Sequence, residues 1–156
     1  MGTEIQFEVC IEYSQIVVCG FDEPFNLWTK RQVQQGFSWR RGVVAFGTPD
    51  DRWDARLFLR VSGEATVPQD ATRAIVVPYE VQTGRLWVGS VTNPDEIQVP
   101  VGNYELLFAM VPTGPEAADY YLSFVPKDLP TKPRILLSDG EIIVHGEFDM
   151  DAKPAV

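Results

Sequence analysis

The sequence has few of the residues on which most enzyme chemistry depends. It contains one histidine, His145, and two cysteines in 156 residues. A nucleophilic triad would have to use His145, and neither Ser123 nor Ser138 has the setting of a nucleophile elbow. Dinucleotide-binding, P-loop, CxxC and HExxH motifs are all missing. We therefore expect a protein that is not an enzyme and that uses no cofactor.

Long hydrophobic runs are missing as well. No stretch of 18 or more apolar residues occurs, so we expect no transmembrane segment. The first ten residues have neither the basic region nor the apolar core of a secretory signal. These features predict a cytoplasmic protein, either free or held near the membrane through a partner.

Positive charge is scarce. The chain has 13 Lys and Arg against 22 Asp and Glu, which gives a net charge of −9. Proteins that bind nucleic acid directly contact phosphates with clustered basic residues, so we expect no such binding here. An acidic surface fits a basic protein partner instead. The charge is uneven, since residues 1–28 contain five acids and no Lys or Arg, although ordinary solvated strand faces give the same pattern.

The two cysteines, Cys10 and Cys19, lie on neighbouring predicted strands, where they could face each other across a hairpin. In a protein that is not secreted, two free thiols are favoured over a disulfide. Neither cysteine has a second Cys or a His at the spacing of a metal site.

Alternation of apolar and polar residues dominates the chain and predicts strands. Residues 4–13 place Ile5, Phe7 and Val9 on one face, and the strand-like residues 15–19 follow closely enough to predict a hairpin. Ten or so such segments, with turns every eight to twelve residues, predict an all-β fold, an antiparallel β-sandwich. Asp139-Gly140 predicts a further hairpin near the C-terminus.

One short helix interrupts this pattern near residues 29–36. Thr29 suits the N-cap, and Gln32 three residues later completes a capping box. Gly36 supplies the left-handed residue after the last turn. Two turns are too short to be stable alone, so we expect Trp28 and Phe37 to pin the ends of the helix to a sheet.

The segment "HGEFDMD" near the C-terminus has acids at every second position. On a strand, His145, Glu147, Asp149 and Asp151 would point the same way and could hold a divalent cation. Metal cages draw ligands from several directions, however, and a solvated face of an edge strand gives the same pattern. We therefore expect no metal site and keep these four residues as the alternative.

One of the four tryptophans has an acidic setting. Trp28, Trp39 and Trp87 lie among apolar or strand residues and are expected in the core. Trp53 lies on a predicted loop among Asp50, Asp51, Arg52 and Asp54. Tryptophan is enriched at binding hot spots, so Trp53 is either an interaction anchor or a side chain tucked under its own loop.

A set of residues resembles the competence protein J (ComJ) family, the inhibitors of the competence DNA-entry nuclease NucA. The resemblance covers roughly residues 9–125 and rests on several short patterns that occur in the family's order. These patterns comprise Ile11, Tyr13, Gln15; Trp28, Thr29, Val33, Gly36, Phe37; Gly42, Phe46; Val77, Pro78, Val81; Pro100, Gly102, Tyr104, Leu106, Val111, Pro112; Asp119, Tyr120.

The resemblance implies a bacterial inhibitor that blocks a basic DNA nuclease by placing carboxylates in its active-site groove. It implies a ComJ-like domain over residues 1–125. The chain departs from the family after that point, and we expect residues 126–156 to form an extension, a Pro-rich linker and a hairpin, packed on the same domain. From charge and expected loop position, the partner-binding residues that we predict are Asp50, Asp51, Trp53 and Asp54, then Asp95 and Glu96, then Asp22 and Glu23.

Two other classes of function stay open at this stage. The chain could be a non-catalytic β-sandwich module that binds a small ligand, a carbohydrate or Ca²⁺. An enzyme is the third reading, and it would depend on His145.

Overall fold

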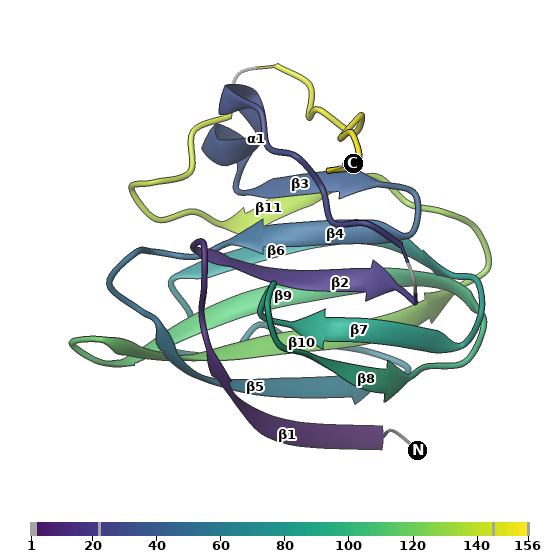
Figure 1. The fold of residues 1–156 in the computed structure, drawn as a ribbon, viewed down its shortest axis with the longest axis horizontal. Helices are drawn as coiled ribbons and strands as arrows, with labels where there is room; N and C mark the ends of the chain where they lie inside the picture. Colours follow the sequence, from purple (N-terminus) through teal and green to yellow (C-terminus); the bar gives the residue numbers. More distant parts are fainter. Residues whose placement is uncertain (1–2, 22, 145, 156) are drawn as a thin grey trace.

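Two β-sheets pack face to face, with one short helix at their edge (Figure 1). The computed structural model describes residues 3–21, 23–144 and 146–155. The architecture confirms the predicted all-β sandwich. Within the described residues, no helix is long and apolar enough to cross a membrane.

The six-stranded sheet has the order β1-β5-β10-β9-β6-β11, and the five-stranded sheet has the order β3-β4-β2-β7-β8. Neighbouring strands are antiparallel except for the parallel pair β5 and β10. The strands of the first sheet are β1 (Thr3–Cys10), β5 (Asp54–Val61), β10 (Ala117–Lys127), β9 (Gly102–Gly114), β6 (Arg73–Val81) and β11 (Arg134–Leu137). Those of the second are β3 (Phe37–Arg40), β4 (Val43–Gly47), β2 (Gln15–Gly20), β7 (Arg85–Gly89) and β8 (Pro94–Gln98).

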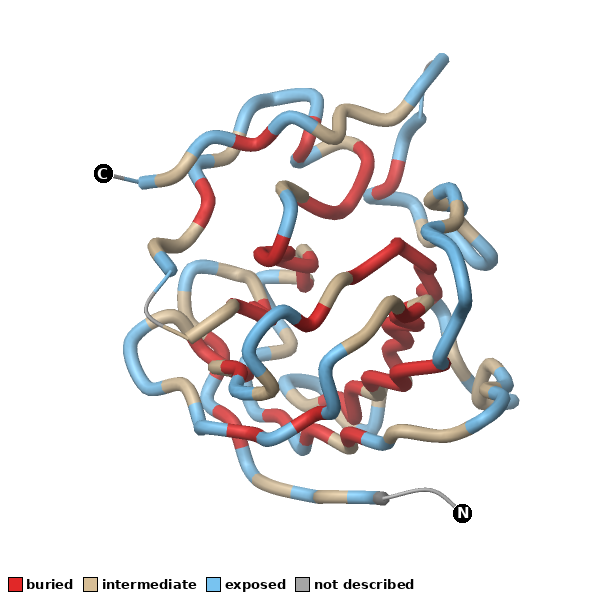
Figure 2. The backbone as a smooth tube through the Cα atoms, turned by 90° about the vertical axis from the view of Figure 1, so that its right-hand side faces the viewer, coloured by how far each residue is buried: buried red, intermediate tan, exposed pale blue. Residues whose placement is uncertain are grey.

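The core lies between the sheets and follows the period of two that the sequence predicted. On β5, Leu57 and Leu59 are buried while Arg56 and Arg60 point out. Figure 2 views the molecule from the right-hand end of Figure 1, with much of the strand backbone buried and the connecting loops largely exposed. Aromatic side chains join the layers: Phe46 of β4 stacks on Phe108 of β9, with ring centroids 4.5 Å apart.

The hairpin predicted for residues 4–19 is wrong. Strand β1 pairs with β5 in one sheet, and β2 pairs with β4 and β7 in the other. Tyr13 and Ser14 both have left-handed backbones, with φ of 56° and 52°, and at this point the chain crosses between the sheets. Cys10 and Cys19 therefore lie on different sheets, and both are free thiols.

The helix α1 (Lys30–Gln35) has the caps that the sequence predicts. Thr29 and Gln32 form the capping box, and Gly36 is left-handed with φ of 90°. Phe37 is fully buried, and the Trp28 indole donates to Gln15 Oε1 at 3.1 Å, so residues at both ends tie the helix to a sheet.

The buried face of α1 is made of glutamines and holds the chain's C-terminal segment. Gln35 exchanges two hydrogen bonds of 2.9 Å with the backbone of Asp149. Further on, Leu27 N–H donates to the Lys153 carbonyl and Ala155 N–H donates to the Phe25 carbonyl, both at 2.8 Å. Helix α1 and the residues before it thus hold the last described residues of the chain against the sandwich.

The second hairpin, predicted at Asp139-Gly140, is also wrong. Strand β11 forms and pairs with β6, but no strand follows it in the part of the chain that the structure describes. The Asp139 carboxylate is bound by Arg73, Ile142 enters the core, and Ile143 N–H donates to the Gln34 carbonyl at 2.7 Å. These contacts draw the backbone away from β11 and over to α1.

Candidate functional site

Three connections meet at the left-hand end of the sandwich in Figure 1, where β1, β4 and β9 finish. Backbone hydrogen bonds tie them together: Thr48 N–H to the Ser14 carbonyl, Ile11 N–H to the Trp53 carbonyl and Asp54 N–H to the Glu116 carbonyl, at 2.8–3.0 Å. We call this region the acidic end and define it by its five carboxylates, which are Glu12, Asp50, Asp51, Asp54 and Glu116.

The carboxylates of the acidic end have no cationic partner among the residues that the structure describes. None of the nine ion pairs that join described side chains includes any of them. All except the half-buried Glu12 are exposed. Arg52 lies within the same loop, but its guanidinium donates to the Ala117 carbonyl at 3.4 Å. The negative charge of this end is therefore available to a partner.

Trp53 lies in the same loop with 45 % of its surface exposed. Its carbonyl accepts the bond from Ile11, which fixes the backbone of the loop, while a large part of the residue faces solvent. An exposed aromatic residue beside unpaired carboxylates has the composition of a protein-binding surface.

The other predicted partner-binding residues differ in whether their carboxylates are paired with an arginine. Asp95 is exposed and lies near the start of β8, at the same end of the sandwich as the acidic end. Arg85 donates from Nε and Nη2 to the two carboxylate oxygens of Glu96, each at 3.1 Å, and that hydrogen bonding lowers the pKa of the Glu96 carboxyl. Glu23 pairs with Arg40 at 3.5 Å. Asp22 lies outside the described residues.

The row of acids considered as a metal site does not form. Glu147, Asp149 and Asp151 are not on a strand, and Asp149 accepts hydrogen bonds from the Gln32 side chain and the Asp151 backbone. His145 lies outside the described residues. Among the residues that are described, no three metal-binding side chains cluster.

A pocket of about 450 Å³ opens beside the acidic end. It lies between the β1–β2 turn, α1 and the residues that follow β11. The lining includes Tyr13, Trp28, Asp50, Arg73, Glu141 and Ile142.

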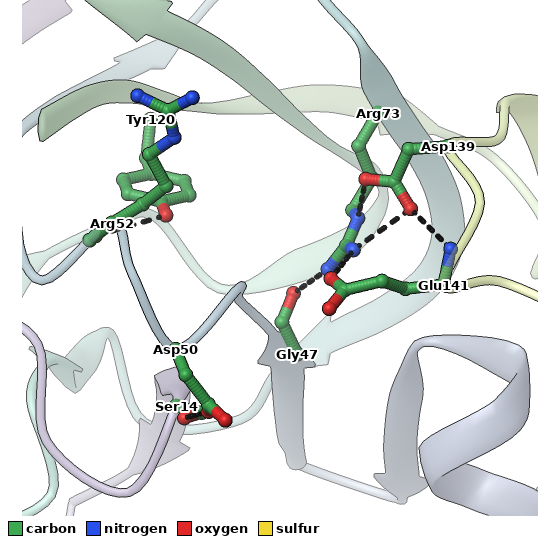
Figure 3. A network of polar contacts seen from close by, with 8 residues as sticks. All are labelled: Ser14, Gly47, Asp50, Arg52, Arg73, Tyr120, Asp139 and Glu141. Atoms are coloured by element: carbon green, nitrogen blue, oxygen red, sulfur yellow. Dashed lines mark hydrogen bonds and ion pairs between the residues drawn. The ribbon is translucent and has the colours of Figure 1, made fainter. Parts of the chain in front are cut away.

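Arg73 anchors one wall of this pocket, and sequence reasoning missed it. Its side chain is only 3 % exposed and makes four hydrogen bonds. In Figure 3 the guanidinium lies between the Gly47 carbonyl (2.6 Å), the Asp139 carboxylate (2.8 and 2.9 Å) and Glu141 (2.7 Å). A signal was present, because Arg73 shares the parity of Ile75 and Val77 and so belongs to the inward face of its strand.

Comparison with known proteins identifies the scaffold. The sequence profile of the competence protein J (ComJ) family matches residues 8–125. The solved structure of ComJ from Bacillus subtilis, an inhibitor of the DNA-degrading activity of NucA, superposes with a TM-score of 0.71 at 22 % identity, over 81 % of this chain and 99 % of that one.

A crocagin biosynthetic gene J structure aligns more loosely, with a TM-score of 0.48 at 16 % identity, over 81 % of this chain and 97 % of that one. No curated protein matches the sequence significantly. At these identities the structural likeness concerns the fold. The profile match is different in kind, since it extends over most of the sequence, and it shows that this chain belongs to the ComJ family.

Proposed function

We propose that this protein is a non-catalytic inhibitor of a DNA-degrading nuclease and that the acidic end enters the nuclease's active-site groove. The observation that carries the proposal is the set of five carboxylates at one end of the sandwich that have no cationic partner in the described part of the chain. The family supports it, because B. subtilis ComJ inhibits NucA. In this proposal, residues 1–125 form the ComJ-like domain and residues 126–156 are an extension of it.

The physical basis of inhibition is mimicry of phosphate charge. A nuclease binds DNA in a groove whose positive charge matches the phosphates. Carboxylates held at fixed positions can occupy that groove and exclude DNA without any chemical reaction. Opposite charges also accelerate the encounter of the two proteins, and added salt weakens this effect.

Within the acidic end, Asp50, Asp51 and Asp54 are the proposed charged contacts, and Trp53 is the proposed anchor at their centre. Asp95 extends the surface along β8. Glu96 and Glu23 contribute less, because each is already paired with an arginine. The partner is a basic nuclease protein, and neither a cofactor nor direct binding of nucleic acid has a role in this mechanism.

The test is capture followed by a DNase assay. The purified protein is used at low salt to capture partners from the lysate of its own organism, and the captured material is assayed for DNase activity with and without added protein. We expect DNase activity that the added protein suppresses. The triple charge reversal D50K/D51K/D54K should weaken inhibition by a factor of roughly 100 or more, the loss of two or more charged contacts.

A matched control separates this site from net charge. The variant E64K/D128K/E147K reverses three exposed acids that lie away from the acidic end and so changes the net charge equally. It should inhibit nearly as well as the unmodified protein. Equal losses in both variants would remove the acidic end from the mechanism, and a captured DNase indifferent to added protein would reject inhibition itself.

A further inference from the structure

We infer that the pocket beside the acidic end binds an arginine side chain of the partner protein, and that the segment after Val125 supplies one wall of this pocket, including the carboxylate of Glu141. The inference rests on the proposed function insofar as the ligand belongs to a protein. Its chemistry follows from the pocket alone.

The pocket is assembled from two parts of the chain. Tyr13, Trp28 and Asp50 come from the region matched by the family profile, residues 8–125. Glu141 and Ile142 come from the segment beyond it. Ile142 is buried, and its side chain lies against Gly36 at the end of α1, where a Cβ would stand 3.3 Å from it. The later segment is therefore a fixed wall of the pocket.

The apolar part of the lining includes two aromatic side chains, Tyr13 and Trp28, beside Val33 and Ile142. Tyr13 is 75 % exposed although its position is set by a left-handed backbone, with φ of 56°. A non-glycine residue in this region costs about 1 kcal/mol, so the fold maintains this exposed ring against a local penalty. Trp28, half-buried on another side of the pocket, is fixed by its bond to Gln15. Aromatic faces attract cations, guanidinium groups most often.

The charge of the lining is negative. Arg73 is the one base of the lining, and two of its four hydrogen bonds go to Asp139, which neutralises it. Asp50 accepts a hydrogen bond from the Ser14 hydroxyl (Figure 3), which leaves its charge uncompensated. The Glu141 side chain is 61 % exposed, and one of its oxygens accepts from Arg73. Arg73, Asp139, Asp50 and Glu141 together carry one positive and three negative charges. Phosphate and other anions are disfavoured in such a site.

Arginine fits this combination better than the alternatives. Its planar guanidinium stacks on aromatic rings while its donors point to carboxylates at the edge, whereas lysine presents a compact and strongly hydrated charge. A neutral sugar would use the rings and leave the charges uncompensated. A nuclease groove that binds phosphates contains the required side chain.

The inference is tested with the tripeptide acetyl-Gly-Arg-Gly-amide and the ¹⁵N-labelled full chain at low salt. We expect saturable shifts of the backbone amide signals of Ser14, Gly36 and Gly47, with a dissociation constant in the range of about 1–10 mM. The citrulline peptide has the same shape without the charge and should bind at least about tenfold more weakly. E141Q and D50N should each weaken the binding of the arginine peptide by about tenfold. E147Q, which changes an acid outside the lining, should leave that affinity unchanged.

Several results would overturn the inference. Equal binding of the arginine and citrulline peptides, or no shifts at these amides, would remove the cation site. Equal binding of a lysine peptide would remove the choice of a guanidinium. D50N does not touch Arg73, so it remains informative even if E141Q loosens the segment. A protein that inhibits its nuclease but ignores the peptide refutes only the pocket, and a protein that binds the peptide without inhibiting any DNase refutes only the proposed function.

Discussion

The two ends of the sandwich differ in whether their exposed carboxylates are paired with arginines. Towards the right-hand end of Figure 1, where β3 finishes and β7 starts, Arg40, Arg41 and Arg85 pair with Glu23, Glu80 and, from the middle of β8, Glu96 at 3.5, 2.7 and 3.1 Å. We call this the arginine end. Arg85 also lies over the Phe21 ring, 3.7 Å from its centroid. At the acidic end, the five carboxylates have no such partner within the described chain.

This difference teaches that the exposed charge of the acidic end is not forced by a shortage of arginines. The chain has arginines on its surface, and they pair with other acids; Arg56, two residues along β5 from Asp54, pairs with Asp119 at 2.9 Å. The buried Arg73 beside the acidic end forms ion pairs with Asp139 and Glu141 and with none of the five carboxylates. Exposed ion pairs add little to stability, so we expect the arrangement to matter more for the proposed binding of a partner.

The largest expected effect is the loss of stability when Arg73 is replaced. R73M leaves Asp139, Glu141 and the Gly47 carbonyl without their common donor, and we expect a loss of about 3–5 kcal/mol in the free energy of unfolding. The matched variant R41M removes an arginine of the arginine end whose side chain is 71 % exposed, and it should lower stability only slightly. Urea unfolding measures both. Equal losses would show that Arg73 is no more important than a surface arginine.

Acid sensitivity should separate the two ends next. Hydrogen bonding to Arg41 and Arg85 lowers the pKa of Glu80 and Glu96 below their ordinary 4.5. A lowered pKa stabilises the fold above the unfolded value, and this contribution disappears as the pH falls from 4.5 through the folded value. The variant E80Q/E96Q should therefore be less stable than the unmodified protein at neutral pH, and its stability should change less with pH below 4.5.

The control for this prediction is D50N/D51N, which removes two carboxylates without an arginine partner. Thermal unfolding across the acid range follows both variants. If the D50N/D51N curve flattens as much as that of E80Q/E96Q, the two ends are not electrostatically different.

The smallest expected effect is a gain in stability at the acidic end. D50N/D51N relieves repulsion among neighbouring carboxylates and should stabilise the fold by up to about 0.5 kcal/mol at low salt. The gain should vanish near 1 M salt, where the screening length is about 3 Å. A loss of stability at low salt would indicate that these aspartates hold the loop together.

Features that depend on local sequence were predictable. The capping box of Thr29 and Gln32 and the left-handed Gly36 involve residues a few positions apart, and the alternation on β5 needs only its own eight residues. The loop carrying Asp50 and Asp51 was predicted from the same kind of information, although Asp54, which was expected in it, is the first residue of β5. Its assignment as the binding surface remains a prediction.

Features that depend on distant partners were not predictable. Residues 4–19 have the pattern of a hairpin, but left-handed Tyr13 and Ser14 carry the chain to the other sheet. Asp139-Gly140 has the pattern of a turn between strands, yet Asp139 is held by an arginine 66 positions earlier. The pocket combines side chains from the β1–β2 turn, the residues before α1, the β4–β5 loop, β6 and the segment after β11, so no single stretch of sequence contains it.

The parallel pairing of β5 with β10 has a consequence for biosynthesis. Residues that pair between these two strands, such as Arg56 and Asp119, lie 63 positions apart in the sequence. Strand β1 lies at the edge of the described sheet, next to β5. At about 5–20 residues per second, a ribosome needs roughly 3–13 s to deliver the second strand after the first. During that interval the β1–β5 ribbon has no third strand beside it. The nascent chain therefore completes its six-stranded sheet only late in translation, after most of the polypeptide has been made.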